Sequence, residues 1–160
     1  MPSLSDLLVA LLDHAVEFVV IGGFAAVAHG SSILTQDLDL CVPFTAMNCE
    51  RLLKALSAFH PRHRENKAPL TSSVPALMRF KNIYLVTDAG PLDLLGQVTG
   101  LGPYAALEQH VITLPLHDRT CRILDIEALI TAKKSMGRPK DKEVIVQLQA
   151  IQNAPKPRRK

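Results

Sequence analysis

The spacing of apolar residues along the chain alternates between helical and extended periods. Leucines at helical spacing over residues 4–15 predict a first amphipathic helix. The β-branched run of residues 18–21 predicts a short buried strand that ends at two glycines. Residues 24–29 then predict a short helix that stops at the next glycine. The chain is therefore expected to begin with helix, strand and helix in close succession.

A second predicted strand, residues 38–42, alternates acidic and apolar side chains. Asp37 and Asp39 fall on one face of it, and the leucines that follow each of them fall on the other. The pattern of apolar and polar residues over 99–118 does not distinguish between helix and strand. The remaining pattern predicts a helix over residues 46–59, an exposed loop over 60–75, strands over 78–87, 91–98 and 120–124, and helices over 125–136 and 139–152.

Helices that interleave with short strands predict an α/β or α+β fold with a mixed sheet. The 160 residues, 48% of them apolar and 21% charged, suit one globular domain, which we place at residues 1–153, followed by a basic tail at 154–160. The longest nearly apolar stretch, residues 18–28, is too short to span a membrane, and the N-terminus lacks the pattern of a signal peptide. Three scattered cysteines, Cys41, Cys49 and Cys121, argue against a disulfide framework or a zinc cluster. A cytoplasmic protein is expected.

The net charge of +3 is divided unevenly along the chain. Residues 133–160 carry nine Lys and Arg and two acidic residues, whereas residues 1–132 carry nine Lys and Arg and thirteen acidic residues. A basic end on an acidic body suggests a polyanionic partner such as nucleotide phosphates or nucleic acid. A solvated helix face with a disordered tail would give the same composition.

Three aspartates lie in apolar strand contexts: Asp37, Asp39 and Asp93. If the strand of residues 91–98 pairs antiparallel with the strand of residues 38–42 or lies adjacent to it, the three carboxylates gather without a lysine or arginine nearby in sequence. The three carboxylates would repel one another unless a cation lay between them. Ligation by oxygen atoms alone favours Mg²⁺ or Mn²⁺ over zinc. A D-x-D pattern alone also occurs by chance, so exposed surface carboxylates are the competing interpretation.

The two glycines before Asp37 and Asp39 favour a functional site over exposed surface carboxylates. Gly22 and Gly23 stand at a strand-to-helix junction, where backbone N–H groups can hold a phosphate and the missing Cβ allows close approach. Thirteen residues separate Gly23 from Asp37. A phosphate cradle followed by two carboxylates is an arrangement that suits a nucleoside triphosphate bound through its metal.

This combination resembles the DNA polymerase β-type nucleotidyltransferase superfamily, and more narrowly the minimal bacterial nucleotidyltransferase-like proteins grouped with AbiEii-type toxins. Those proteins have a GG-x-A-x-x-x-HG start, a T-x-D-x-D strand and a late K-x-x-x-G-R-x-K-D segment. The matching positions here are Gly22, Gly23, Ala25, His29, Gly30, Thr35, Asp37, Asp39, Lys133, Gly137, Arg138, Lys140 and Asp141.

The resemblance implies a role for each matching residue. Asp37 and Asp39 would bind the divalent metals, and Asp93 would ligate the catalytic metal and accept the proton of the attacking hydroxyl. The nucleotide-binding positions would be Gly22, Gly23, Thr35, Lys133, Arg138 and Lys140. Asp88 competes for the third carboxylate role, although its Asp-Ala-Gly setting is typical of a turn.

The first functional hypothesis is a Mg²⁺-dependent nucleotidyltransferase that moves a nucleoside monophosphate from an NTP to a hydroxyl. The resemblance implies RNA, such as a tRNA end, or a protein as acceptor, and a toxin paired with an antitoxin protein as one biological setting. The second hypothesis is a catalytically inactive nucleotide- or RNA-binding module of the same fold. The third is a structural subunit that pairs with another chain through its basic end.

Overall fold

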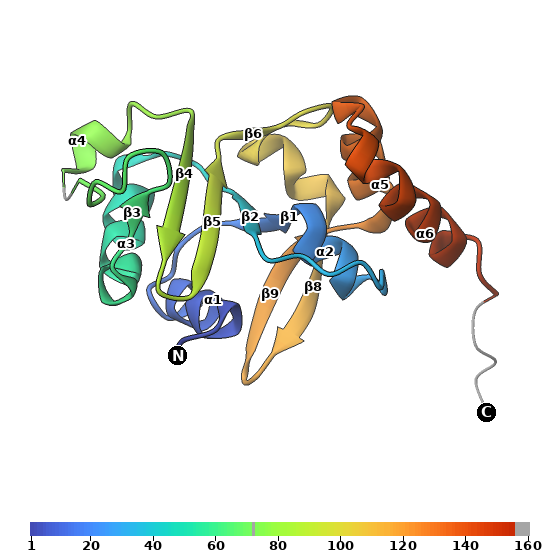
Figure 1. Ribbon diagram of the computed structural model, residues 1–160, viewed down its shortest axis with the longest axis horizontal. Helices are drawn as coiled ribbons and strands as arrows, with labels where there is room; N and C mark the ends of the chain where they lie inside the picture. The colour runs from blue at the N-terminus through green and yellow to red at the C-terminus, as the bar shows by residue number, and fades with distance from the viewer. Residues whose placement is uncertain (72, 156–160) are drawn as a thin grey trace.

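A seven-stranded mixed sheet forms the centre of the molecule, with the strand order β3-β4-β5-β2-β1-β9-β8. The computed structural model describes residues 1–71 and 73–155 (Figure 1). Strands β2 and β5 are parallel, as are β1 and β9, and the other neighbouring strands are antiparallel. The strands of the sheet are β1 (Val19–Ile21), β2 (Leu38–Cys41), β3 (Arg62–His63), β4 (Asn82–Thr87), β5 (Gly90–Leu95), β8 (Val111–Leu116) and β9 (Arg119–Leu124).

Helices pack around this sheet, with α5 and α6 together at one end of the molecule and α3 and α4 at the other (Figure 1). A separate two-stranded sheet joins β6 (Gln97–Val98) to β7 (Gly102–Pro103). The helices are α1 (Leu4–Asp13), α2 (Gly22–Ala28), α3 (Ala46–Leu56), α4 (Val74–Leu77), α5 (Ile126–Met136) and α6 (Lys142–Gln152), with 3₁₀ turns η1 (Ser57–Phe59), η2 (Tyr104–His110) and η3 (Pro139–Asp141). The mixed α/β architecture predicted from the sequence is confirmed.

The hydrophobic core lies on the face of β2 and β5 that is opposite the aspartates. Alternation along each strand turns their leucines into the core and leaves Asp39 and Asp93 on the other face. These leucines are completely buried in one cluster with the apolar stripes of α1 and α3. The central residues of that cluster are Leu7, Leu8, Leu11, Leu38, Leu40, Leu52, Leu56, Leu92 and Leu94.

Local sequence signals account for the ends of two helices. Ser3 caps α1 through the backbone N–H of Asp6, and Asp125 caps α5 through the N–H of Ala128 (2.7 Å). Gly137 ends α5 in the left-handed conformation, with φ of +63°. These caps fix where the two helices start and stop.

Two segments differ from the prediction. Residues 60–75 are not a simple exposed loop, because Arg62 and His63 pair with β4 as an edge strand and α4 follows at Val74. The strand predicted over 78–87 starts only at Asn82, because the backbone of residues 77–80 still bonds to the preceding helical turn. The ambiguous residues 99–118 contain β7, η2 and β8.

No helix in the described part of the chain is long and apolar enough to cross a membrane. Cys41, Cys49 and Cys121 are all buried and free. The predicted basic tail, residues 154–160, lies outside the described residues from residue 156 onward, and the domain boundary at residue 153 stays a prediction.

Candidate functional site

Two neighbouring parallel strands bring two of the predicted carboxylates side by side. Asp39 of β2 and Asp93 of β5 occupy the same position in the strand register, so their side chains leave the same face of the sheet. Asp37 directly precedes β2, and Thr35 holds its backbone. The Thr35 hydroxyl accepts from the Asp37 N–H (3.3 Å) and donates to its carbonyl (3.2 Å).

The two predicted glycines pack directly against this acidic cluster. Strand β1 pairs with β2 so that Ile21 is opposite Asp39, and α2 begins at the next residue, Gly22, rather than at residue 24. Gly22 has φ of +71°, and a Cβ there would lie 2.2 Å from Asp39 Oδ2. A Cβ on Gly23 would lie 3.0 Å from the Thr35 side chain. Gly22 therefore requires glycine, whereas a side chain at Gly23 would need only a small shift of Thr35.

Replacing Gly22 by alanine is expected to destabilise the protein by about 3 kcal/mol and to displace the Asp39 carboxylate. The cost has two parts, a left-handed backbone conformation and a contact that no real Cβ makes. Chemical denaturation measures the sum. Gly137→Ala is the matched control, since Gly137 has a similar φ of +63° and nothing within 4 Å of its Cβ position. Equal losses in the two variants would show that the Asp39 contact costs nothing.

Asp39 is the electrostatic centre of the cluster. Burial, together with the negative charges of Asp93 and Asp37, raises the pKa of the Asp39 carboxyl from 3.8 to about 7, and the positive charge of Lys133 opposes the shift only in part. The folded chain therefore leaves the site short of positive charge at neutral pH. A bound cation would relieve that deficit.

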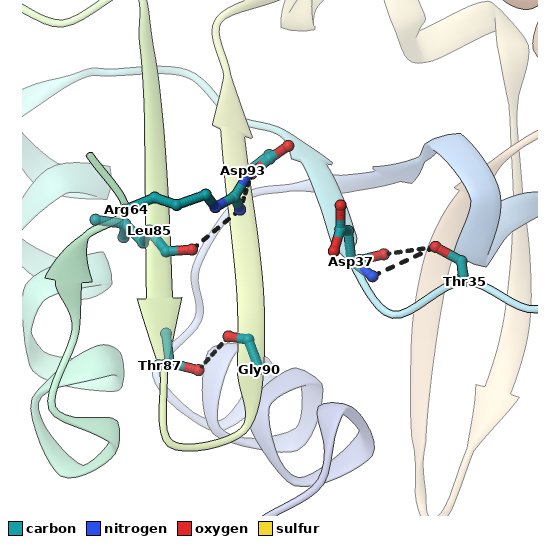
Figure 2. A network of polar contacts seen from close by, with 7 residues as sticks. All are labelled: Thr35, Asp37, Arg64, Leu85, Thr87, Gly90 and Asp93. Atoms are coloured by element: carbon teal, nitrogen blue, oxygen red, sulfur yellow. Dashed lines mark hydrogen bonds and ion pairs between the residues drawn. The ribbon is translucent and has the colours of Figure 1, made fainter. Parts of the chain in front are cut away.

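Asp93 already has a cationic partner. Arg64, which directly follows β3, reaches across β4 and forms an ion pair with Asp93 Oδ1 through its Nη2 atom, which also donates to the Leu85 carbonyl (3.1 Å) (Figure 2). No sequence pattern predicts this contact, because residues 60–75 have no regular spacing of apolar residues and Arg64 lies 29 positions before Asp93. Arg64 is thus a residue of the site that the motifs did not identify.

Two of the predicted phosphate-binding cations are joined by a buried carboxylate. Asp141 Oδ1 lies 3.3 Å from Lys133 Nζ, and Arg138 Nε donates to Asp141 Oδ2 (2.6 Å). Lys133 and Asp141 are each only 4% exposed. The third predicted cation, Lys140, is exposed. Asp141 was part of the matched segment but had no role assigned to it, and here it holds both cations.

The acids and cations line adjoining hollows in the surface. The larger has a volume of about 420 Å³, and a smaller one of about 160 Å³ shares Asp39, Asp93, Lys133 and Arg138 with it. Together they bring all nine predicted site residues to one place: Gly22, Gly23, Thr35, Asp37, Asp39, Asp93, Lys133, Arg138 and Lys140. A different hollow of about 570 Å³ lies between Phe44, Phe80 and Tyr104, away from the carboxylates.

The donor set suits a hard divalent cation, since it offers carboxylate oxygens only. The raised pKa of Asp39 independently indicates uncompensated negative charge there. Within residues 1–71 and 73–155, however, no group of three His, Cys, Asp or Glu side chains is already placed around one point as metal ligands. The ion pair of Asp93 with Arg64 turns one of the three acids toward a protein partner.

A solved structure shares this arrangement of elements. A Thermotoga maritima protein described as a "putative nucleotidyltransferase" superimposes with a TM-score of 0.56 at 16% sequence identity, covering 91% of this chain and 89% of that one. The chain has a nucleotidyltransferase-like fold. No family model and no curated protein matches the sequence, so the narrower AbiEii-type relationship stays a prediction.

Within the nucleotidyltransferase-like fold, Asp88 and His29 have structural partners away from the three carboxylates. Asp88 lies in the turn between β4 and β5 and accepts from His60 Nδ1 (2.6 Å), so it does not compete with Asp93. His29 ends α2, and its Nε2 donates to the Leu124 carbonyl (2.7 Å).

Proposed function

We propose that this chain is a divalent-metal-dependent nucleotidyltransferase that transfers a nucleoside monophosphate from an NTP to a hydroxyl group. The observation that carries the proposal is the parallel register of β2 and β5, which sets Asp39 beside Asp93 with Asp37 next to them. Lys133 and Arg138 line the same hollow and would bind phosphate oxygens. The fold shared with the Thermotoga protein supports the general class.

Each residue of the site has a role in this proposal. Asp37, Asp39 and Asp93 would hold Mg²⁺ or Mn²⁺, and Asp93 would also accept the proton of the attacking hydroxyl once Arg64 has released it. Gly22 and Gly23 would let the phosphates approach the start of α2, and Thr35 holds the backbone of Asp37 in place. When bound, the metal ions supply Lewis-acid stabilisation of the attacking and leaving oxygens.

The acceptor and biological setting extend the proposal. A hydroxyl of RNA, such as a tRNA end, or of a protein side chain is the acceptor class we propose, with a toxin–antitoxin pair as the setting. The basic character of residues 133–160 supports an anionic acceptor or partner. Labelling settles the acceptor directly: the chain is incubated with NTPs labelled at the α-phosphate, cellular RNA and cell extract, and the labelled macromolecule is identified.

Asp37→Asn is expected to lower transfer by roughly 10³-fold with little change in stability, because the substitution removes a metal ligand that makes no side-chain ion pair in the described part of the chain. Label incorporation and thermal unfolding are measured on the same preparations. Asp118→Asn, at an exposed position in the turn between β8 and β9, is the control. Transfer at the wild-type rate by Asp37→Asn would refute the assignment.

A binding module without catalysis is the second candidate. The ion pair between Arg64 and Asp93 favours it, because it already neutralises the acid that catalysis needs. The two candidates differ in how nucleotide binding depends on metal. A thermal shift caused by NTP that is the same with and without Mg²⁺ favours the binding module, and a shift that requires Mg²⁺ favours the enzyme.

A further inference from the structure

Arg64 is held firmly in contact with Asp93 by several groups. Its backbone N–H donates to the Tyr84 carbonyl (2.9 Å), and its guanidinium lies 6.0 Å from the centre of the Tyr84 ring. Its Nη2 atom bonds to Leu85 and to Asp93, whose side chain is only 16% exposed. The guanidinium therefore has a defined position against a largely buried carboxylate.

The same guanidinium is incompletely satisfied. Its Nε atom is buried and has no hydrogen-bond partner in the part of the chain that the structure describes. A buried arginine that serves only stability generally has its N–H groups bonded, often in a two-pronged contact with a carboxylate. Arg64 instead contacts Asp93 through one nitrogen, and its Nε–H has no acceptor among the described residues.

We infer that Arg64 couples metal binding at Asp93 to nucleotide binding. This inference rests on the proposed function, because it concerns the same site. Arg64 occupies Oδ1 of Asp93 and offsets the negative charge of that carboxylate, so a metal ion arriving alone has only Oδ2 free and is repelled by the guanidinium. A metal ion that takes both oxygens must displace Arg64, which then loses its carboxylate partner.

A bound nucleotide would give the displaced guanidinium a new anionic partner. Its phosphates bring negative charge into the hollow together with the metal ion, and a guanidinium binds phosphate oxygens as well as it binds a carboxylate. Arg64 can therefore exchange Asp93 for phosphate when nucleotide and metal bind together. The chain thus binds metal weakly alone and tightly with nucleotide, which keeps Asp93 covered until a substrate is present.

The test measures Mn²⁺ affinity by electron paramagnetic resonance of the free ion, with and without an NTP analogue that has a methylene group between the α- and β-phosphates. Arg64→Gln is expected to bind Mn²⁺ alone about tenfold more tightly than the wild type, since one charged hydrogen bond no longer competes. The analogue should tighten Mn²⁺ binding by the wild type and should do so about tenfold less in Arg64→Gln.

Two variants control for changes in folding and in overall charge. Arg62→Gln removes the same charge two residues earlier, where no ion pair is formed within the described ranges, and should bind Mn²⁺ as the wild type does. Arg64→Lys keeps a cation beside Asp93 and should stay near the wild-type affinity. It also tests the inference if Arg64→Gln does not fold, because Mn²⁺ binding tightened tenfold in Arg64→Lys would show that charge does not compete.

The outcomes separate this inference from the proposed function. If Arg64→Gln binds Mn²⁺ alone no more tightly than Arg62→Gln while the wild type still transfers label, the coupling role is wrong and the nucleotidyltransferase stands. If the wild type binds Mn²⁺ neither alone nor with the analogue and transfers no label, both fail.

Discussion

Asp39→Asn is expected to lower nucleotidyl transfer by roughly 10³-fold and, at about pH 8, to make the protein more stable by about 1–3 kcal/mol. The two effects have one cause. In the proposed function Asp39 binds the metal ion through its negative charge, and without a cation that charge is unfavourable because of burial and the neighbouring Asp93 and Asp37. Substitution of a residue that serves only the structure would lower the activity and the stability of the protein together.

The pH dependence of stability gives the sign of this effect without an activity assay. The pKa of Asp39 is about 7 in the folded chain, above its ordinary value of 3.8, so the folded state binds more protons between those limits. The free energy of unfolding therefore falls as the pH rises through this window, and Asp39→Asn should flatten the fall. Urea unfolding across the window measures it, with Asp118→Asn as the control, since Asp118 is exposed and makes no ion pair in the described part of the chain. A variant less stable than wild type at about pH 8 contradicts the interpretation.

Asp141→Asn is expected to reduce the free energy of unfolding by about 3–5 kcal/mol, because it leaves the buried Lys133 without its carboxylate. Burial alone would raise the pKa of Asp141, but the hydrogen bonds from Arg138 and the charge of Lys133 outweigh it and lower that pKa. The stabilisation is therefore present at neutral pH and is lost in acid below the ordinary carboxyl range.

An exposed ion pair provides the comparison for Asp141. Glu50→Gln breaks the exposed pair with Lys54 on α3 and should cost no more than about 0.5 kcal/mol. Urea unfolding at neutral pH compares the two variants. Nucleotide affinity should also fall in Asp141→Asn, because Lys133 and Arg138 lose the group that holds them at the hollow. Equal losses of stability in both variants would mean that the buried cluster contributes no more than a surface pair.

The elements that carry the site could be predicted because local signals define them. Alternation along residues 37–40 places Asp37 and Asp39 on one face, and Asp125 and Gly137 bound α5 through backbone geometry that sequence rules describe. These features depend on a few neighbouring residues. The segments of the site therefore follow from the sequence, and their relative placement does not.

The register of β2 against β5 depends on the whole sheet, since no residue near Asp39 or Asp93 specifies a parallel partner. The start of α2 differs from the prediction for a local reason. A helix was expected to start after both glycines, but α2 starts at Gly22 because the close approach to Asp39 requires the missing Cβ. Arg64 could not be placed because the two-residue strand before it has no period of its own.

The acids and the cations of the site come from different parts of the architecture (Figure 1). Asp39 and Asp93 stand on central strands, whereas Lys133 and Arg138 stand on either side of the left-handed Gly137 that joins α5 to η3. In the proposed function, substitutions after residue 132 that leave the buried pair of Lys133 and Asp141 in place would change how phosphates are bound without moving the carboxylates on the strands. Anion binding and metal binding at this hollow can then be varied separately.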